Sequence, residues 1–279
     1  MTLTAVHAGA HLHHVAFESA DPERLARFYA EAMDMRLERI DADEWRCEGP
    51  ARRFIARRGA ARQLAFAGLA CREADGLAAL RARAEDEGLA IEPSPSPYFR
   101  DGAFGVRDPD GNLVCFGLAR PQGDGLTGLQ APTQHLTFAS LDVEAFQAFY
   151  CDRLGFALSD RVLHPDGEMA TCFVRSNHEH HTIACFKSDR QGVDHHSYEA
   201  GTWNGIRDWC DRFGGLGIEL MWGPGRHGPG NNLFAFIADP DGNWIEISAE
   251  LEVIHDRPSK DWPQEPRTLN LWGRAIMRS

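Results

Sequence analysis

Apolar and polar residues alternate with the two-residue period of β-strands in several short segments and follow the helical period in others. Residues 232–237 and 244–248 alternate as half-buried strands do. Residues 239–243 (DPDGN) predict a turn between them, because glycine can take the positive φ that a tight connection needs. Residues 22–32 carry an apolar helical stripe. It follows Asp21, which suits an N-cap, and begins with Pro22, which suits the first helical position.

The second half of the chain repeats this pattern. Asp142 predicts an N-cap before another apolar stripe, and residues 203–213 predict a later helix. That helix is predicted to begin after Thr202 and to end at Gly214 and Gly215. Its inward face is predicted to comprise Trp203, Ile206, Trp209, Cys210 and Phe213. Residues 77–87 predict its counterpart in the first half.

The repetition extends to individual residues. Four residues of the first half recur at one constant offset: His14, Asp21, Phe28 and Tyr29 match His135, Asp142, Phe149 and Tyr150. The turn sequence DPDGN stands at residues 108–112 and again at 239–243. The chain therefore reads as a duplicated module.

The duplication and the order of elements predict an α+β fold of two tandem modules. Each module is expected to consist of paired βαβββ units that form a barrel-like sheet. We place the N-terminal module at residues 1–120, a linker rich in Gly, Pro and Gln at 121–134, and the C-terminal module at 135–254. Residues 255–279 are expected to form an irregular tail that bears aromatic side chains.

Composition narrows the class of protein. Hydrophobic residues make up 43% and charged residues 25% of the chain, as in globular proteins, and the formal net charge is −12. That charge argues against nucleic-acid and anionic membrane partners but does not exclude a small anionic substrate. The seven cysteines form no CxxC pair, and no signal peptide or long apolar run is apparent, which predicts reduced thiols and a cytoplasmic protein. We also expect a homo-oligomer.

The two halves differ where chemistry is expected. The second DPDGN is followed by Trp-Ile-Glu246, whereas the first is followed by Leu-Val-Cys115. Aligning residues 193–199 with 61–67 places His195 opposite Gln63. His195 is preferred to His196 because only one of two adjacent strand residues faces inward. The second half thus holds the trio His135, His195 and Glu246, and the first half holds His14, Gln63 and Cys115.

Two imidazoles and one carboxylate are the ligands of a facial triad. On Fe(II), this set leaves open positions for a substrate and for dioxygen. On Zn(II), the same donors would polarise a water or a carbonyl. The residues alone predict a metal site in the second half and leave this choice open.

The chain resembles the two-module type I extradiol ring-cleavage dioxygenases of the vicinal oxygen chelate (glyoxalase/bleomycin-resistance/dioxygenase) superfamily. Residues 225–232 (GRHGPGNN) and 239–246 (DPDGNWIE) carry the resemblance most specifically, and it covers both halves. It implies a catalytic C-terminal module and a metal-free N-terminal one. It also implies Fe(II), or Mn(II) in some members, on His135, His195 and Glu246.

The resemblance implies roles for further residues. His181, in the pair His180–His181, would give acid/base assistance in the oxygen pocket, and His227 would act in catalysis and bind a substrate oxygen. The remaining candidates for substrate binding are Arg226, Phe236, Tyr198 and Trp244. Family members commonly have a Tyr where this chain has Phe236, and a phenyl ring cannot make that hydrogen bond. Tyr198 and His196 are possible substitutes.

The function implied is extradiol cleavage of a catechol-type ring with insertion of dioxygen, giving a hydroxymuconic-semialdehyde type product in the breakdown of aromatic compounds. One alternative is a metal-dependent lyase, isomerase or thiol transferase of the same superfamily. Such enzymes typically need a fourth ligand, commonly supplied by paired modules that both contribute. The first module offers His14, Gln63 and Cys115 in place of a Glu and His set, which argues against this alternative. Another alternative is a metal-free protein that binds small molecules.

Overall fold

The N-terminal half folds into one mixed sheet with two main helices. In the computed structural model, which describes residues 2–123 and 125–277, the sheet has the strand order β2-β3-β4-β1-β5-β8-β7-β6. Its elements are α1 (Thr4–His7), β1 (His11–Ser19), α2 (Pro22–Ala32), β2 (Arg36–Arg39), β3 (Glu44–Gly49), β4 (Arg52–Arg58), β5 (Gln63–Cys71), α3 (Ala74–Asp86), β6 (Glu92–Pro93), β7 (Phe104–Arg107) and β8 (Leu113–Leu118).

The C-terminal half builds a second sheet in the same way, with the order β14-β15-β16-β13-β9-β12-β11-β10-β17. Its elements are β9 (Thr133–Ser140), α4 (Val143–Ala148), the π-helical turn η1 (Phe149–Arg153), β10 (Ala157–Leu163), β11 (Met169–Arg175), β12 (Ile183–Lys187), β13 (Gly192–Glu199), α5 (Trp203–Gly215), β14 (Trp222–Arg226), β15 (Leu233–Ala238), β16 (Trp244–Ala249), β17 (Lys260–Pro263) and α6 (Pro266–Leu269).

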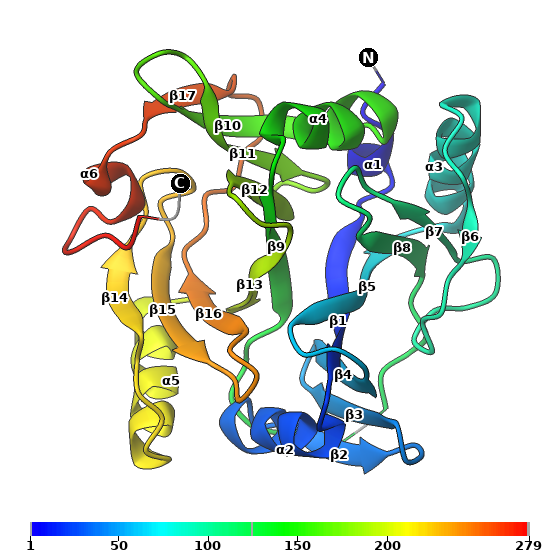
Figure 1. Cartoon of the computed structure of the whole chain (residues 1–279). Coiled ribbons are helices and arrows are strands. Elements are labelled where there is room, and N and C mark those ends of the chain that lie inside the picture. The colour runs from blue at the N-terminus through cyan, green and yellow to red at the C-terminus, as the bar shows by residue number, and fades with distance from the viewer. Residues whose placement is uncertain (1, 124, 278–279) are drawn as a thin grey trace.

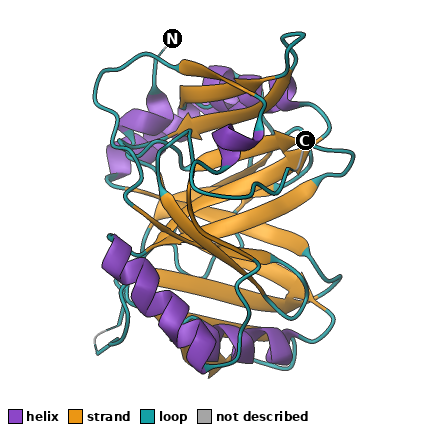
Figure 2. Cartoon of the chain, turned by 90° about the vertical axis from the view of Figure 1, so that its left-hand side faces the viewer, coloured by secondary structure: helices purple, strands orange, loops and turns teal. Residues whose placement is uncertain are grey.

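Each sheet joins two βαβββ units through their first strands. β1 lies between β4 and β5, and β9 lies between β12 and β13. The two modules stand side by side with β1 and β9 toward each other, and most of the helices lie toward the top and bottom of the molecule, where they pack against the sheets (Figures 1 and 2). The predicted α+β fold of tandem modules built from paired βαβββ units is confirmed.

The helix starts follow from local chemistry. Asp21, Asp142 and Thr202 each accept a hydrogen bond from a backbone N–H of the first helical turn, as predicted. Two details of the prediction for α5 were wrong. The helix continues through Gly214 and Gly215, and Trp203 is 46% exposed rather than turned inward.

The two copies of the repeat hold the modules together reciprocally. Oη of Tyr29 in the first module donates to Oδ2 of Asp239 in the second, at 3.2 Å. Oη of Tyr150 in the second module donates to Oδ2 of Asp108 in the first, at 3.4 Å. The matching Phe-Tyr and DPDGN motifs therefore meet across the boundary between the modules.

The tail is more regular than predicted. β17 pairs in parallel with β10 and extends the second sheet, and α6 follows it. The prediction of an irregular tail was therefore wrong for this segment. Its strand depends on pairing with β10, which lies far earlier in the chain, and a local pattern does not show such a pairing. At the other boundary, β9 begins at Thr133, two residues inside the predicted linker. None of the helices in the described residues combines the length and apolar character needed to cross a bilayer.

The strand registers correct the alignment of the two halves. In the second sheet Ser197 pairs with Glu246, and in the first sheet Gly68 pairs with Cys115. The residue two positions before Gly68 is Phe66, which therefore corresponds to His195. The predicted match of His195 with Gln63 was wrong by three residues.

Candidate metal centre

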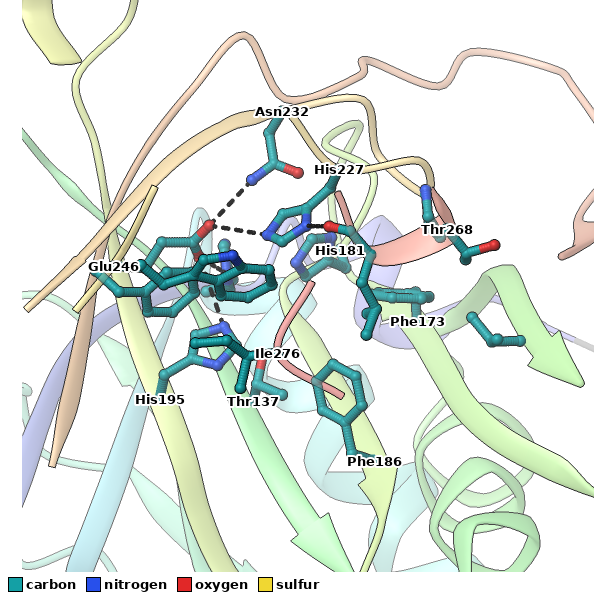
Figure 3. Close-up of a pocket in the computed structure, with 16 residues that line it drawn as sticks. Thr137, Phe173, His181, Phe186, His195, His227, Asn232, Glu246, Thr268 and Ile276 are labelled. Carbon is teal, nitrogen blue, oxygen red and sulfur yellow. Dashed lines mark hydrogen bonds and ion pairs between the residues drawn. The ribbon is translucent and has the colours of Figure 1, made fainter. Parts of the chain in front are cut away.

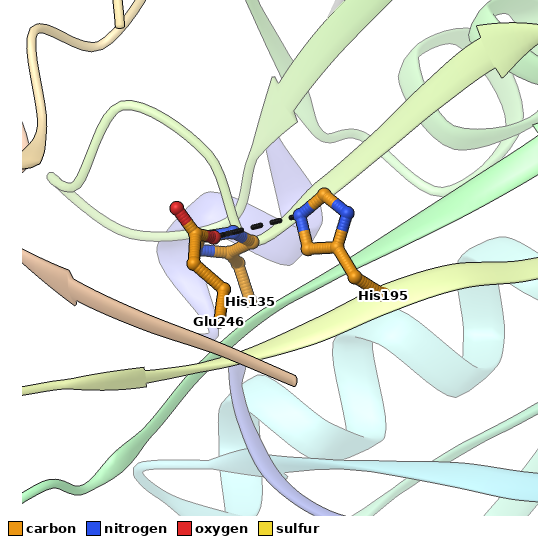
Figure 4. A group of neighbouring side chains, drawn as sticks. All are labelled: His135, His195 and Glu246. Carbon is orange, nitrogen blue, oxygen red and sulfur yellow. Dashed lines mark ion pairs between the residues drawn. The ribbon is translucent and has the colours of Figure 1, made fainter. Parts of the chain in front are cut away.

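Three adjacent strands present the predicted ligands to one point. His135 on β9, His195 on β13 and Glu246 on β16 are all buried, and one ligand atom from each lies within 4.8 Å of the others. Oε2 of Glu246 lies 2.8 Å from Nε2 of His135 and 3.5 Å from Nε2 of His195. Figure 4 shows the Glu246 carboxylate beside the His135 ring, with a dashed line that joins it to the His195 ring.

The remote nitrogen of each imidazole has a partner that fixes the ring. Nδ1 of His135 is 3.2 Å from Oε1 of Gln134, and Nδ1 of His195 is 2.6 Å from Oδ1 of Asp194. An Nδ1–H that donates to these oxygens leaves the Nε2 lone pair of each ring free to bind a metal.

The local backbone of β13 decides which of its two adjacent histidines joins the site. The pairing of β13 with β9 is irregular on both sides of His195 and His196. Bulges of this kind re-aim side chains and are frequent beside active sites. His195 faces the site, whereas His196 faces the first module, where its Nε2 is 3.1 Å from Oη of Tyr29.

The electrostatics suit a cation. Burial on its own raises the pKa of Glu246, but His135, His195 and His227 outweigh that effect and hold the pKa well below its ordinary value. Burial lowers the pKa of His135, which favours the neutral imidazole that a metal requires. Burial on its own also lowers the pKa of His195, but the hydrogen bonds to Asp194 and Glu246 outweigh burial and raise it, so a metal that binds this ring has to displace a proton. An ionised carboxylate and two imidazoles that converge in a buried space are a donor set that fits a divalent metal.

A pocket opens over these three residues. Its empty volume is about 560 Å³, part of it open to solvent. None of the residues that line it is Lys or Arg, and its apolar wall consists of Val162, Phe173, Phe186, Trp222, Pro229, Phe236, Leu269 and Ile276. The polar groups are His135, Thr137, His181, His195, His227, Asn232, Glu246 and Thr268 (Figure 3). This mixture suits a flat apolar ring held by a few polar contacts.

His181 and His227 both line this pocket. The His181 ring lies 4.2 Å from that of His135, centroid to centroid, and burial lowers its pKa well below the ordinary value. Nδ1 of His227 is 2.5 Å from the carbonyl oxygen of Leu269, so it donates there. Nε2 of His227 is left facing Oε1 of Glu246 at 3.6 Å.

Comparison with known proteins places the chain in a family. The model of the glyoxalase/bleomycin resistance protein/dioxygenase superfamily matches residues 11–116 and 133–247. The chain belongs to this superfamily. It is 28% identical to metapyrocatechase 2 of Cupriavidus necator over 78% of this chain and 74% of that protein. It is 26% identical to biphenyl-2,3-diol 1,2-dioxygenase of Paraburkholderia xenovorans over 85% of both chains.

Solved structures share the fold. Homoprotocatechuate 2,3-dioxygenase from Arthrobacter globiformis superimposes with a TM-score of 0.83 at 20% identity, over 95% of this chain and 88% of that one. The Mn(II)-bound glyoxalase from Novosphingobium aromaticivorans gives a TM-score of 0.76 at 24% identity, over 96% and 93%. The same fold therefore occurs in both a dioxygenase and a glyoxalase, and the residues of the site, rather than the fold, distinguish the two functions.

Three of the predicted substrate contacts do not line the pocket. The Arg226 guanidinium pairs with Glu250 at 2.7 Å and lies over the ring of Trp272. Tyr198 is fully buried on the face of β13 that also carries His196. Trp244 lies behind Phe236, 5.6 Å between ring centroids, and lines a neighbouring hollow. Of the four additional candidates, only Phe236 lines the pocket.

Sequence reasoning did not single out Asn232 or the tail residues Thr268, Leu269 and Ile276. Nδ2 of Asn232 donates to Oε1 of Glu246 at 3.2 Å and to Ser248, which turns Oδ1 away from the carboxylate. That buried Oδ1 has no hydrogen-bond partner among the described residues. Thr268, Leu269 and Ile276 of the tail close one side of the pocket. Asn232 is the last residue of the GRHGPGNN signature, and this position in a family motif is the sequence feature that could have identified it as a site residue.

The corresponding place in the first module is filled by side chains. Cys115 and Phe66 pack there with Tyr98 and Phe99, and Nε2 of His14 is 2.8 Å from Oγ of Ser96. Burial raises the pKa of Cys115 to about 11, which keeps it a thiol. One imidazole, one phenyl ring and one thiol are a poor donor set for a divalent metal.

Proposed function

We propose that this protein opens the ring of a catechol-type substrate beside its two adjacent hydroxyls, with insertion of both atoms of dioxygen, at a non-haem Fe(II) centre. Mn(II) is the alternative metal. The observation that carries the proposal is the buried triad His135, His195 and Glu246 beneath an apolar pocket that His181 and His227 also line. The ring-opened product would be of the hydroxymuconic-semialdehyde type.

His135, His195 and Glu246 would hold the ion. Their donor atoms converge from adjacent strands, and the same three residues line the pocket in which a substrate would meet the metal. When bound, the metal would supply Lewis acidity toward the two adjacent oxygens of a diol and redox chemistry for dioxygen. Gln134 and Asp194 hold the imidazoles in the orientation that this requires.

His181 would exchange a proton with the substrate, and His227 would bind a substrate hydroxyl. His181 is buried against His135, and its Nδ1 is 3.0 Å from His180, so Nε2 is the nitrogen left to exchange a proton with the substrate. His227 uses Nδ1–H for the carbonyl of Leu269 and keeps Nε2 for a substrate hydroxyl. Oδ1 of Asn232 can accept from a second hydroxyl, which compensates for the phenyl ring of Phe236.

The pocket wall indicates the kind of substituent. Phe173, Phe186 and Leu269 present apolar surface, and none of the lining residues is a cation that could balance a carboxylate. We therefore infer a catechol whose substituent is an uncharged alkyl or ring group. The relatives named for catechol and biphenyl-diol cleavage support this reaction class over most of the chain.

The competing function is a metal-dependent lyase, isomerase or thiol transferase. This candidate is considered because a Mn(II)-bound glyoxalase has the same fold. The donor set argues against it, since all three ligands come from the second module and the matching residues of the first are His14, Phe66 and Cys115. A metal-free binding protein is disfavoured by the convergent buried ligands.

One experiment separates the three functions. The protein is loaded with Fe(II) under anaerobic conditions, mixed with a 3-alkyl or 3-aryl catechol, and then exposed to air while oxygen uptake and absorbance are recorded. Ring cleavage predicts oxygen uptake together with a yellow product. Retained metal without oxygen uptake on any catechol would favour the lyase class. Failure to retain a metal would favour the binding protein.

A further inference from the structure

A buried polar group behind His181 connects the pocket to the tail. Asp160 on β10 is fully buried and accepts four hydrogen bonds: from Nε2 of His180 at 2.9 Å, Nη1 of Arg257 at 2.9 Å, the backbone N–H of Lys260 at 3.0 Å and Nε1 of Trp262 at 2.9 Å. Nδ1 of His180 is 3.0 Å from Nδ1 of His181. Asp160 is thus two hydrogen bonds away from a pocket side chain.

The direction of these hydrogen bonds is fixed at Asp160. Burial raises the pKa of this carboxyl, but the hydrogen bonds from His180, Arg257 and Trp262 outweigh burial and hold the pKa at about 2. An ionised carboxylate only accepts, so Nε2 of His180 carries the hydrogen. A single hydrogen then lies between Nδ1 of His180 and Nδ1 of His181. If His181 carries this hydrogen, its Nε2 faces the pocket as an acceptor; if His180 carries it, Nε2 of His181 bears a hydrogen and faces the pocket as a donor.

The cluster is a hydrogen-bond network rather than a second metal site. Ligand atoms of Asp160, His180 and Glu252 do lie within 4.8 Å of one another. The Arg257 guanidinium, however, already bridges both carboxylates, with one contact of 2.9 Å to Asp160 and two of 2.6 Å to Glu252. Both carboxylate oxygens of Glu252 are thus paired with Arg257, and both oxygens of Asp160 accept hydrogen bonds.

We propose that Asp160 and His180 are positioning residues for His181, holding its ring and setting which of its nitrogens carries hydrogen toward the pocket. With Nε2–H of His180 donating to Asp160, Nδ1–H of His181 donates to Nδ1 of His180, and Nε2 of His181 then faces the pocket as an acceptor for a substrate hydroxyl. This inference rests on the proposed function, because the substrate must supply the hydroxyl.

The tail would thereby orient both pocket histidines that are not ligands. Arg257, Lys260 and Trp262 belong to the tail and bind Asp160, and the tail carbonyl of Leu269 accepts from His227. The tail then has two roles: it positions the side chains of His181 and His227, and it forms part of the pocket wall.

The test compares Asp160→Asn with Glu252→Gln. Each variant turns a carboxylate that binds Arg257 into the corresponding amide. Of the two side chains, only that of Asp160 hydrogen-bonds the His180 ring; Glu252 contacts His180 through its backbone carbonyl, which the substitution leaves in place. For the Fe(II)-loaded enzyme we expect Asp160→Asn to lower kcat by about 10–100-fold, part of the ~10²–10⁴-fold that a positioned acid/base group contributes. KM and metal content should stay near the wild-type values, and Glu252→Gln should keep wild-type kcat.

A second readout does not depend on turnover. Nuclear magnetic resonance of ¹⁵N-histidine-labelled, metal-free protein reports which nitrogen of His181 carries hydrogen. Asp160→Asn should change that pattern, and Glu252→Gln should leave it as in the wild type. If Asp160→Asn does not fold, His180→Gln serves as the second variant, with the same expected fall in kcat.

The outcomes are distinguishable. Equal kcat in wild type and Asp160→Asn, or an equal loss in Asp160→Asn and Glu252→Gln, would overturn the positioning role. An unchanged hydrogen pattern at His181 would also overturn it. Absence of ring cleavage in the wild type, combined with a changed pattern in Asp160→Asn, would refute the proposed function and leave the hydrogen-bond relationship standing.

Discussion

Nε2 of His135 lies 2.8 Å from Oε2 of Glu246, although the strands that carry them, β9 and β16, are separated by β13. The intervening strand contributes His195, whose Nε2 is 3.5 Å from the same oxygen. Three neighbouring strands therefore each contribute one donor, and the geometry depends on their register. A rigid sheet can hold such a set without any help from loops.

The first prediction concerns metal content. We expect one metal per chain in the loaded protein, and we expect His135→Ala, His195→Ala and Glu246→Ala each to lose most of it. Removing one of three protein ligands leaves the ion weakly held. Elemental analysis after gel filtration measures this directly.

The matched controls lie in the first module. Cys115→Ala and His14→Ala change the residues that correspond to Glu246 and His135, and both should leave metal content unchanged. Two metals per chain, or a loss of metal in either control, would contradict the assignment of the site to the second module.

The second prediction separates His181 and His227 from the ligands. His181→Ala and His227→Ala should each retain metal while kcat falls by ~10²–10⁴-fold, the usual effect of losing a positioned acid/base group. Metal analysis and steady-state kinetics on the same preparations provide the check. If His181→Ala loses its metal, this histidine is a ligand rather than a proton-transfer group.

The third prediction concerns Phe236. Its ring is 1% exposed and lies 5.2 Å from that of His195 and 5.4 Å from that of Trp222, centroid to centroid. Phe236→Tyr adds a hydroxyl to an apolar wall, where an unpaired buried hydroxyl costs ~1–3 kcal/mol. We expect kcat/KM to fall for catechols with alkyl or ring substituents. Faster turnover of simple catechols would instead show a pocket that lacks only the usual phenol, and no change would show that Phe236 does not contact substrate.

The fourth prediction concerns stability and pH at the module boundary. Burial raises the pKa of Asp108, the partner of Tyr150, to about 6. In the unfolded chain the value is ~3.9, so the folded state binds the proton more tightly. Ionisation then removes stability as pH rises from about 4 to about 6, by up to about 3 kcal/mol in the free energy of unfolding.

Urea unfolding of the wild type and Asp108→Asn across this pH range tests the sign. The variant should lose this part of the pH dependence, because an amide does not titrate there. A wild-type stability that increases over the window, with the same slope in Asp108→Asn, would contradict the assignment.

Local and repeated features of the sequence predicted most of the fold. The caps Asp21, Asp142 and Thr202 act within one helical turn, so nearby residues suffice to find them. The internal repeat identified His135 and Glu246 because both lie in segments that the halves share closely. The β13 segment has diverged, and Phe66 rather than Gln63 proved to correspond to His195.

Long-range contacts account for what could not be predicted. Asp160 meets Arg257 and Trp262 only because β17 pairs with β10, and no local pattern encodes that pairing. Tyr198 was a candidate substrate contact, but it lies in the buried core on the face of β13 that carries His196. Strand alternation alone could not show which partner covers each face of a buried strand.

The most direct test of the proposed ring cleavage uses isotopically labelled oxygen. The Fe(II)-loaded protein is supplied with ¹⁸O₂ and a 3-alkyl or 3-aryl catechol, and the product is analysed by mass spectrometry. The account predicts a ring-opened product that carries both labelled atoms, formed with one oxygen consumed per catechol, and no such product from Glu246→Ala. A product without label, or one whose ring remains closed, would contradict it.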